Sequence, residues 1–263
     1  MIKLFTRDKS RPGALPELSL SRASLTKAMK IENRYLDGTY LSSNPDWDCS
    51  DSLWKAKLVE HILEIAQIDV NSFVEVGCGS GYVLLQLSKV FSNALFTGYD
   101  VSPQLQSFWE SEAFLKSKNV IFKLSDFHST CRDYFDVLLM LDVFEHVRDP
   151  FTFLEESRKF ARFFIFHIPL DLSAQSVLRL TPLIDVRNKV GHLNSYTKEL
   201  ALQTLKDCGY TIIMSEYSGD ILPLPLSGLS TRCAALPRKV LSFFNKDFSV
   251  RLLGGETLVV LAK

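Results

Sequence analysis

A glycine-rich turn in the first third of the chain has the residue types and spacing of a loop that binds a nucleoside. Residues 74–81 read Val-Glu-Val-Gly-Cys-Gly-Ser-Gly, with an apolar run before them and helical spacing after them. Glycine lets a backbone turn sharply and approach a ligand closely. Asp100 ends the next apolar run, 23 residues after Gly77, where a carboxylate can bind both hydroxyls of a ribose. The two features predict a nucleoside site at the carboxyl ends of two strands.

The spacing of the three glycines bears on which nucleoside is bound. The dinucleotide fingerprint is Gly-x-Gly-x-x-Gly, and its third glycine packs the helix against the strand. Here the third glycine is Gly81, one residue early, and Tyr82 stands at the fingerprint position. The spacing therefore argues against NAD, although an NAD-dependent oxidoreductase stays an alternative.

Two histidines are candidates for acid–base catalysis. His146 follows the expected fourth strand, at the sheet edge, where a histidine could deprotonate a hydroxyl or amine nucleophile. His192 lies in a loop just before an expected helix, and such loops often carry function. The alternative for both is a structural histidine that packs or hydrogen-bonds locally. His167, inside the fifth expected strand, is expected to be a packed residue.

Four segments of the chain together resemble the class I S-adenosylmethionine-dependent methyltransferases. Residues 74–81 match the first motif of that family, and Asp100 matches its ribose-binding acid. Residues 124–127 are similar to the segment that holds the adenine, and residues 135–147 to the fourth-strand motif. The ending Glu145-His146-Val147 is typical of the branch that contains the ubiquinone-pathway O-methyltransferases.

The resemblance spans roughly residues 45–215 and implies S-adenosylmethionine as the cofactor. It implies that Glu75 and the glycine backbone hold the amino-acid part of the cofactor, that Asp100 holds the ribose, and that Asp126 and Phe127 flank the adenine. Leu141 is implied to line the site through its backbone. The full set of expected cofactor-binding residues is Glu75, Gly77, Cys78, Gly79, Gly81, Asp100, Val101, Asp126, Phe127, Leu141 and Trp54.

Trp54 belongs to this set because, in that family, the helix before the first strand folds over the cofactor. Residues 51–55 resemble such a lid helix. The alternative is that Trp54 lies on the core face of an amphipathic helix. Asp142 departs from the family pattern, since relatives commonly carry other small or acidic residues there.

An alternation of strands and helices must position these residues. Runs that are apolar on both faces and alternate with helices indicate a parallel sheet covered on both sides. We expect a Rossmann-like α/β fold with a mainly parallel seven-stranded sheet and helices on both faces. One of the last two strands can run antiparallel, because a full crossover helix between them is available only within residues 231–246. The expected strands cover residues 73–76, 94–99, 120–124, 135–141, 163–168, 210–217 and 257–262.

The chain divides into an N-terminal arm with lid helices, residues 1–70, and a methyltransferase domain, residues 71–263. Insertions at about residues 169–190 and 219–254 are longer than plain connections, and such insertions usually shape a substrate pocket, here as a cap. The second insertion mixes basic and aromatic residues. This mixture favours a cap helix with a solvated basic face, with contact to a membrane surface or a lipid-like substrate as the alternative.

The amino-acid composition limits which classes of partner we expect. Lys and Arg together number 30, as do Asp and Glu, so bulk positive charge does not favour nucleic acid as a partner. No apolar run reaches the ~18 residues of a membrane span, and no signal peptide is evident. The five cysteines are spread without a Cys-x-x-Cys pair, which argues against disulfides and a metal site. We therefore expect a cytoplasmic monomer or homodimer with reduced thiols.

These observations together predict an enzyme that transfers a methyl group from S-adenosylmethionine to a small-molecule acceptor, at oxygen. His192 and His146 are its expected catalytic residues. Two alternatives stay open: an NAD-dependent oxidoreductase, and a non-catalytic protein that keeps the cofactor pocket as a scaffold or sensor.

Overall fold

The computed structural model describes residues 33–47, 49–223 and 229–263. The chain divides into two compact units, Met1–Asn33 and Arg34–Lys263, and the account below concerns the second. The expected N-terminal arm lies almost entirely outside the described residues. Among the described residues, no helix is long and apolar enough to cross a membrane.

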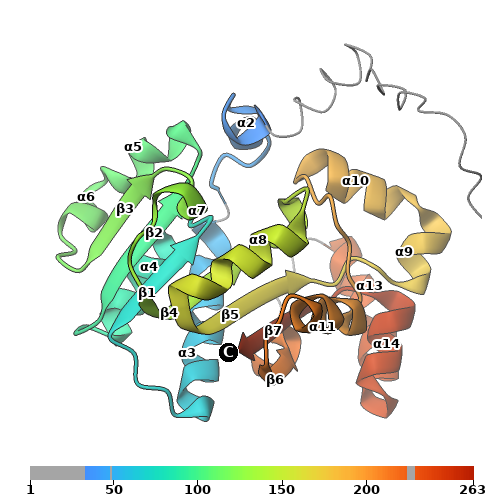
Figure 1. Cartoon of the computed structure of the whole chain (residues 1–263). Helices are drawn as coiled ribbons and strands as arrows, with labels where there is room; N and C mark the ends of the chain where they lie inside the picture. The colour runs from blue at the N-terminus through green and yellow to red at the C-terminus, as the bar shows by residue number, and fades with distance from the viewer. Residues whose placement is uncertain (1–32, 48, 224–228) are drawn as a thin grey trace, which may run out of the picture. The chain divides into compact units, whose positions relative to one another are not determined.

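A seven-stranded sheet forms the centre of this unit, in the order β3-β2-β1-β4-β5-β7-β6 (Figure 1). The first five strands of this order run parallel to one another, whereas β7 is antiparallel to both of its neighbours. The expected mainly parallel sheet with a reversed strand near its end is confirmed. The strands are β1 (Ser72–Val76), β2 (Leu95–Asp100), β3 (Val120–Leu124), β4 (Phe135–Leu141), β5 (Ala161–Pro169), β6 (Ile212–Tyr217) and β7 (Thr257–Ala262).

Both faces of the sheet are covered, as the apolar strands predict. Alternate side chains of β4 point to opposite faces, so Leu138 joins one core cluster while Val137 and Leu139 join the other. Helices α8 (Pro150–Ser157) and α11 (Lys198–Asp207) contribute to the first cluster. Helices α3 (Ser52–Ala66) and α4 (Tyr82–Val90) contribute to the second (Figure 1).

The alternation of strands and helices predicts a single helix over about residues 103–116, between the second and third strands, and this prediction is wrong. The structure has three short pieces there, η3 (Pro103–Leu105), α5 (Gln106–Trp109) and α6 (Glu112–Leu115). Trp109 stacks on Phe122 of β3, and Phe114 packs edge-on against the same ring. Residues five apart lie about 140° apart around a continuous helix, at ~100° per residue. The helix must therefore break for both rings to reach Phe122.

The two expected insertions form neighbouring helical segments. The first carries α9 (Ala174–Arg179) and α10 (Thr181–Lys189). The second carries α12 (Ser218–Ile221), α13 (Leu229–Phe244) and α14 (Lys246–Leu253). Helix α14 packs against both α13 and α9. The insertions are therefore joined beside the end of β5 and the start of β7 (Figure 1).

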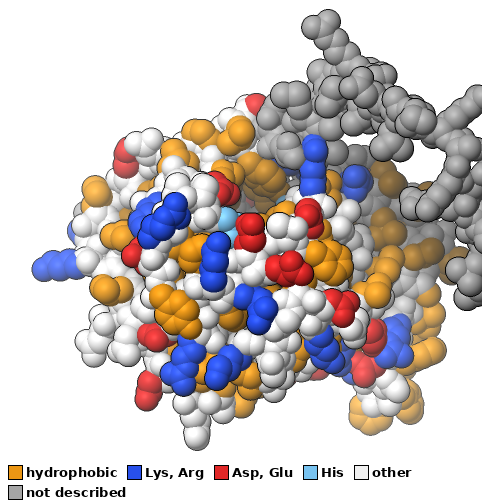
Figure 2. All heavy atoms as spheres, in the orientation of Figure 1, with side chains coloured by type: hydrophobic (Ala, Val, Ile, Leu, Met, Phe, Trp, Pro, Cys, Tyr) orange, Lys and Arg blue, Asp and Glu red, His pale blue; other side chains and the backbone are white. Residues whose placement is uncertain are grey.

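The short elements complete the described chain and place several loops at the carboxyl edge of the sheet. On the face drawn in Figure 2, basic and acidic side chains alternate with hydrophobic ones in the described part, as the balanced composition predicts. These elements are η1 (Asn33–Tyr35), α2 (Thr39–Ser43), η2 (Cys49–Asp51), α7 (Phe127–Thr130), η4 (Phe144–His146) and η5 (Arg158–Phe160).

Candidate active site

The loop between β1 and α4 requires its glycines for two separate reasons. Gly77, Gly79 and Gly81 have φ of 69°, 51° and 80°, a left-handed conformation that side chains other than glycine rarely adopt. Neighbouring side chains also leave no room for a Cβ. One added to Gly79 would lie 2.8 Å from the indole of Trp47, and one added to Gly81 would collide with Phe122. The loop therefore presents its backbone rather than side chains, and the aromatic rings of Trp47 and Phe122 pack against it.

Asp100 closes the same loop from the end of β2. Its carboxylate accepts hydrogen bonds from Gly79 N at 3.0 Å and from Ser102 N at 2.9 Å. Trp109 also holds the loop, because its indole N–H donates to the carbonyl of Gly79 at 3.0 Å. Burial raises the pKa of Asp100 despite the backbone hydrogen bonds that lower it. The structure thus brings the predicted acid to the predicted glycines.

Glu75 is a buried carboxyl group that lacks a full set of partners. It is 3% exposed, and its Oε2 has no hydrogen-bond partner among the described residues. Burial and the charge of Asp100, opposed by the charge of nearby Lys55, raise its pKa to about 8. A buried acid without a partner destabilises the protein, so this position is suited to a ligand that brings a cation. The buried thiol of Cys78 follows three residues later, and burial raises its pKa as well.

The remaining predicted residues lie at the same edge in different settings. Asp126 caps α7 by accepting a hydrogen bond from Ser129 N at 2.8 Å. The ring of Phe127 is buried against Tyr99, with centroids 5.1 Å apart. Val101 is exposed, and Leu141 is buried where β4 ends. Asp126, Val101 and Leu141 are therefore at strand ends or just beyond them, while the ring of Phe127 belongs to the core.

Asp142, the departure from the family pattern, joins three other elements. It has a φ of 58°, and its carboxylate lies 2.8 Å from Lys55 Nζ of α3 and 2.7 Å from His167 Nδ1 of β5. His167 Nε2 in turn lies 2.9 Å from Thr257 Oγ1 of β7. Trp54 packs edge-on against His167, with ring centroids 5.5 Å apart. His167 is thus packed, as expected, and also hydrogen-bonded at both ring nitrogens.

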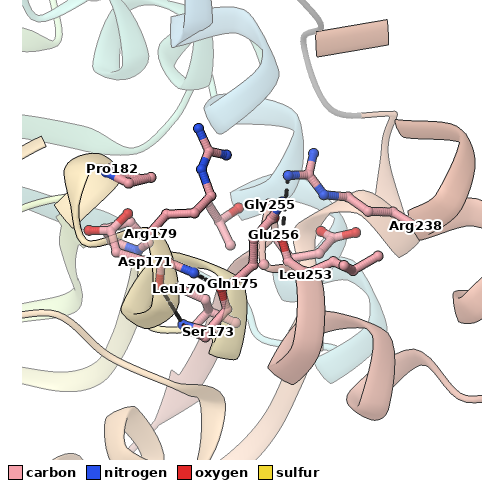
Figure 3. Close-up of a pocket in the computed structure, with 14 residues that line it drawn as sticks. Leu170, Asp171, Ser173, Gln175, Arg179, Pro182, Arg238, Leu253, Gly255 and Glu256 are labelled. Carbon is pink, nitrogen blue, oxygen red and sulfur yellow. Dashed lines mark hydrogen bonds between the residues drawn. The ribbon is translucent and has the colours of Figure 1, made fainter. Parts of the chain in front are cut away.

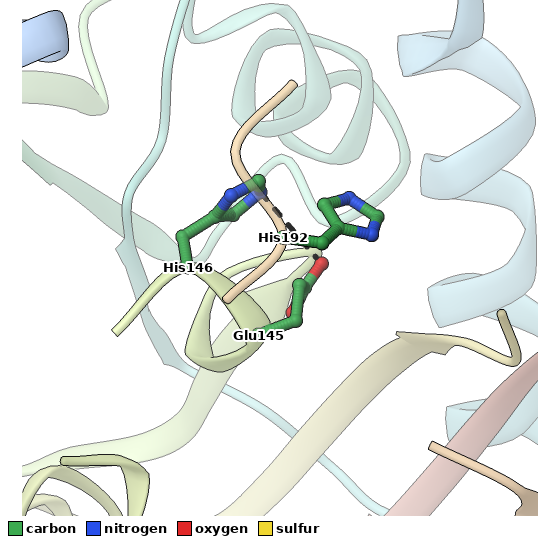
Figure 4. Close-up of side chains that lie close together, drawn as sticks. All are labelled: Glu145, His146 and His192. Carbon is green, nitrogen blue, oxygen red and sulfur yellow. Dashed lines mark ion pairs between the residues drawn. The ribbon is translucent and has the colours of Figure 1, made fainter. Parts of the chain in front are cut away.

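Both predicted catalytic histidines lie together beyond β4 (Figure 4). The rings of His146 and His192 are 4.8 Å apart between centroids. His146 Nε2 is 3.8 Å from the carboxylate of Glu145, which is fully buried. The backbone N–H groups of Leu193 and Asn194 both donate to the carbonyl of Glu145, at 2.7 and 3.0 Å. These bonds attach the His192 loop to the turn that carries His146.

Asp171 is the partner of His192 that sequence reasoning missed. His192 Nδ1 lies 2.5 Å from Asp171 Oδ2, so one ring nitrogen is fixed by a carboxylate. Such a pair sets the tautomer and leaves Nε2 to accept a proton. Asp171 follows β5, 21 residues before His192. No local spacing signals the pair, because an intervening helical insertion determines how the two residues meet.

Burial favours the uncharged forms of two members of this cluster. Burial, together with charge repulsion from His192, lowers the pKa of His146 to about 4. Burial, together with the charge of Asp142, raises the pKa of Glu145 well above its usual range. Glu145, His146 and His192 also offer three ligand atoms within 4.8 Å of one another. The cluster can therefore move a proton or hold a divalent cation.

The loop after β4 lies directly against the glycine loop. A Cβ on Gly77 would come 3.0 Å from a methyl group of Val143, so the two loops pack without a gap. Val143 stands between Asp142 and the turn that holds His146. The nucleoside-type edge of β1 and β2 and the histidine cluster are consequently neighbours.

Comparison with known proteins identifies this arrangement. Residues 74–162 match a family model described as a methyltransferase domain. A curated relative, the ubiquinone biosynthesis O-methyltransferase of Hydrogenovibrio crunogenus, is 24% identical over 148 residues. That match covers 53% of this chain and 61% of the relative. The chain thus spans less than two thirds of the relative's length.

Solved structures share the fold at low identity. Coclaurine N-methyltransferase bound to N-methylheliamine and SAH gives a TM-score of 0.53 at 16% identity, covering 78% of this chain and 71% of that one. The plantazolicin methyltransferase BpumL in complex with SAH gives 0.54 at 16% identity, covering 90% and 99%. A putative methyltransferase in complex with the Haloferax volcanii Trm112 activator gives 0.56 at 17% identity, covering 89% and 96%.

The match to a methyltransferase domain over residues 74–162 and the fold shared with the solved methyltransferases bear out the expected resemblance to the class I S-adenosylmethionine-dependent methyltransferases. The glycine loop and Asp100 lie within the matched residues. The histidine cluster draws on both sides of that boundary, because Glu145 and His146 are inside it and His192 is outside.

Replacing Asp142 with Asn should destabilise the protein and change its response to acid. Although burial opposes it, the charges of His167 and Lys55 hold the pKa of Asp142 well below its usual value. This carboxylate therefore stabilises the fold above about pH 4, and the contribution is lost as pH falls further. We expect Asp142→Asn to cost about 2 kcal/mol at pH 7, between the values for exposed and buried pairs.

Urea unfolding followed by tryptophan fluorescence from pH 7 to pH 3 measures this effect. The difference in the free energy of unfolding between wild type and Asp142→Asn should shrink below about pH 4. Asp69→Asn, which changes an exposed carboxylate, is the matched control and should stay within ~0.5 kcal/mol of wild type. Equal stability of Asp142→Asn and wild type at pH 7 would contradict the role of this ion pair.

Proposed function

We propose that this domain transfers a methyl group from S-adenosylmethionine to a hydroxyl oxygen of a small-molecule acceptor. The observation that carries the proposal is the direct packing of the glycine loop against the segment that leads to the histidine cluster, through Gly77 and Val143. A nucleoside-type binding edge and a proton acceptor are thereby adjacent. We place the reaction in the cytoplasm, where the free thiols of the described cysteines stay reduced.

The residues of the first two strands fit the cofactor. S-adenosylmethionine, when bound, supplies a methyl group that an oxygen nucleophile displaces in line from sulfur. The unpartnered Oε2 of Glu75 suits the ammonium group of its amino-acid part. Asp100 suits the ribose hydroxyls, and the bare backbone at Gly79 allows close approach. We assign Gly77, Cys78, Gly81, Val101, Asp126, Phe127, Leu141 and Trp54 to the walls of the same site.

His192 accepts the proton of the acceptor hydroxyl in this proposal. Asp171 holds Nδ1, so Nε2 carries the lone pair that takes the proton as the oxygen bonds to carbon. The low pKa of His146 keeps that ring neutral beside His192, so it does not repel the imidazolium that forms. A second role has its own observation, since the ligand atoms of Glu145, His146 and His192 converge. A divalent cation held there would acidify the hydroxyl instead.

The lid and cap belong to the same proposal. Trp47 covers Gly79 and α3 brings Trp54 and Lys55 to the carboxyl edge of the sheet. We propose residues 33–70 as the described part of a lid, with the insertions at about residues 169–190 and 219–254 as a cap over the acceptor. Exclusion of water beneath such a cover strengthens every charge interaction within it.

Calorimetric titration of S-adenosylhomocysteine and NAD in parallel tests the cofactor. We expect saturable binding of S-adenosylhomocysteine and none of NAD. Asp100→Asn should weaken binding about tenfold, as expected for a lost hydrogen bond to a charged group. Asp69→Asn is the control with its carboxylate outside the site. Binding of NAD alone would contradict the proposal and favour an NAD-dependent oxidoreductase. Binding of S-adenosylhomocysteine without turnover of S-adenosylmethionine on any acceptor would favour a non-catalytic scaffold or sensor.

Binding of S-adenosylhomocysteine should release a proton from Glu75. This carboxyl group is largely neutral at pH 6 because its pKa is raised to about 8, and pairing with an ammonium requires the ionised form. Affinity should therefore rise with pH between pH 6 and 7.5, by up to about tenfold per unit. Glu75→Gln should abolish this slope, whereas Glu64→Gln, on the exposed face of α3, should retain it. A wild-type affinity independent of pH would refute the assignment.

Replacing His192 with Ala should slow turnover without weakening cofactor binding. Loss of a general base lowers kcat by roughly a hundredfold to ten-thousandfold. Asp171→Asn should also lower kcat, because the tautomer of His192 is no longer fixed. His61→Ala, on α3 away from the cluster, is the matched histidine control. The assay uses the best acceptor from a panel of phenols and catechols.

The same variants distinguish a base from a metal ligand. If His192 acts as a base, treatment with EDTA leaves wild-type activity unchanged, and the acid limb of the pH profile of kcat/KM disappears in His192→Ala. Loss of wild-type activity in EDTA, restored by Mg²⁺, would instead assign His192 to cation binding.

A further inference from the structure

A cavity of about 340 Å³ lies between the two insertions, beside the histidine cluster (Figure 3). Its walls come from the end of β5, from α9, from α13 and from the turn between α14 and β7. The volume falls within the range of small-molecule sites, roughly 300–1,000 Å³. We call it the arginine pocket, defined by Asp171, Ser173, Arg179, Arg238, Gly255 and Glu256.

The two acids of the arginine pocket already have positively charged or donor partners. Asp171 Oδ2 lies 2.5 Å from His192 Nδ1, within hydrogen-bond distance. Glu256 accepts a hydrogen bond from Lys246 Nζ at 2.5 Å and another from Gly219 N at 3.3 Å. Among the described residues, neither carboxylate forms an ion pair with an arginine of the pocket.

The two arginines, by contrast, have no carboxylate partner among the described residues. Arg238 donates one long hydrogen bond, from Nη2 to the carbonyl of Leu253 at 3.4 Å. Its Nε is buried and has no partner among the described residues. No hydrogen bond or ion pair of the Arg179 side chain occurs within the described part of the chain. The pocket consequently holds two guanidinium groups without an ion pair among the described residues, that of Arg238 half-buried and that of Arg179 exposed.

The backbone makes room for one of these groups. Gly255 has a φ of 81°, and a Cβ at this position would lie 2.6 Å from the guanidinium carbon of Arg238. The guanidinium thus rests against bare backbone, where any other residue would displace it. Figure 3 shows Arg179 and Arg238 reaching in from opposite sides, with their guanidinium groups on the same side of the pocket.

The arginine pocket adjoins the histidine cluster, because Asp171 lines the pocket and also pairs with His192. Thr257, which also lines the pocket, is bonded to His167 and through it to Asp142. An anion held between the arginines would therefore lie in the same pocket as Asp171 and Thr257.

We propose that the arginine pocket binds a carboxylate or phosphate of the methyl acceptor, which makes the substrate an anionic small molecule. Guanidinium groups pair with either anion through two parallel hydrogen bonds. The identification of the bound anion as part of the methyl acceptor rests on the proposed methyl transfer. The binding of the anion itself can be measured without turnover.

The test is calorimetry on the full chain saturated with S-adenosylhomocysteine, with two matched pairs of probes. The pairs are 3,4-dihydroxybenzoate with catechol, and phenyl phosphate with phenol, so the carboxylate and the phosphate are compared separately. The anionic member of at least one pair should bind at least about tenfold more tightly than its neutral counterpart. Arg238→Gln and Arg179→Gln should each reduce this advantage by several fold, and Arg238→Lys should lose less than Arg238→Gln.

Arg162→Gln is the matched control, because Arg162 is exposed near the start of β5, at the opposite edge of the sheet. An unchanged affinity for S-adenosylhomocysteine shows that each variant is folded. Equal binding of anionic and neutral probes to wild type, no binding of any anionic probe up to about 10 mM, or an advantage that survives both Gln variants would each overturn the proposal. Those results leave the proposed function standing, whereas loss of S-adenosylhomocysteine binding by wild type would remove the proposed function instead.

Discussion

The ammonium group of Lys55 is the positive charge on which the carboxyl edge of the sheet depends. It forms an ion pair with Asp142 at 2.8 Å, and its charge also stabilises the ionised forms of Glu75 and Glu145. These three acids belong to β1 or follow β4, and burial in a poorly hydrated setting disfavours the ionised form of each. Helix α3, which carries Lys55, therefore sets much of the electrostatics of the carboxyl edge of the sheet.

A second constraint acts through space rather than charge. Trp47, Phe122 and Val143 each occupy the volume that a side chain would need at a glycine of the loop. The loop can therefore hold a ligand only through its backbone and through the neighbouring acids. Because Val143 lies just beyond the end of β4 and directly before the turn that holds His146, its packing against Gly77 couples the position of the histidine cluster to the glycine loop.

Much of this architecture is local in sequence, and that part could be predicted. Each strand is a short apolar run, and the spacing of the glycine loop and Asp100 indicates that they meet, so the fold and this contact could be predicted. The partners of the acid–base groups could not be predicted, because Thr257 is 90 residues from His167 and Asp171 lies across an insertion from His192. The broken helix near Trp109 was missed for a related reason: the geometry of Phe122 on another strand overrides local helix propensity.

The distribution of charge along the edge is consistent with methyl transfer to an anion. A sulfonium cofactor is positively charged, and the acids Glu75, Asp100 and Asp142 gather on the side of β1, β2 and β4. The unpaired guanidinium groups of Arg179 and Arg238 lie instead beside β5 and β7, beyond the Asp171–His192 pair. The acids and the guanidinium groups thus lie in different parts of the edge, so opposite charges on a bound cofactor and an anionic acceptor would attract the two reactants toward the residues between them. In the proposed reaction, transfer of the methyl group would neutralise the sulfonium and weaken that attraction, so the same charge arrangement would favour release of the products.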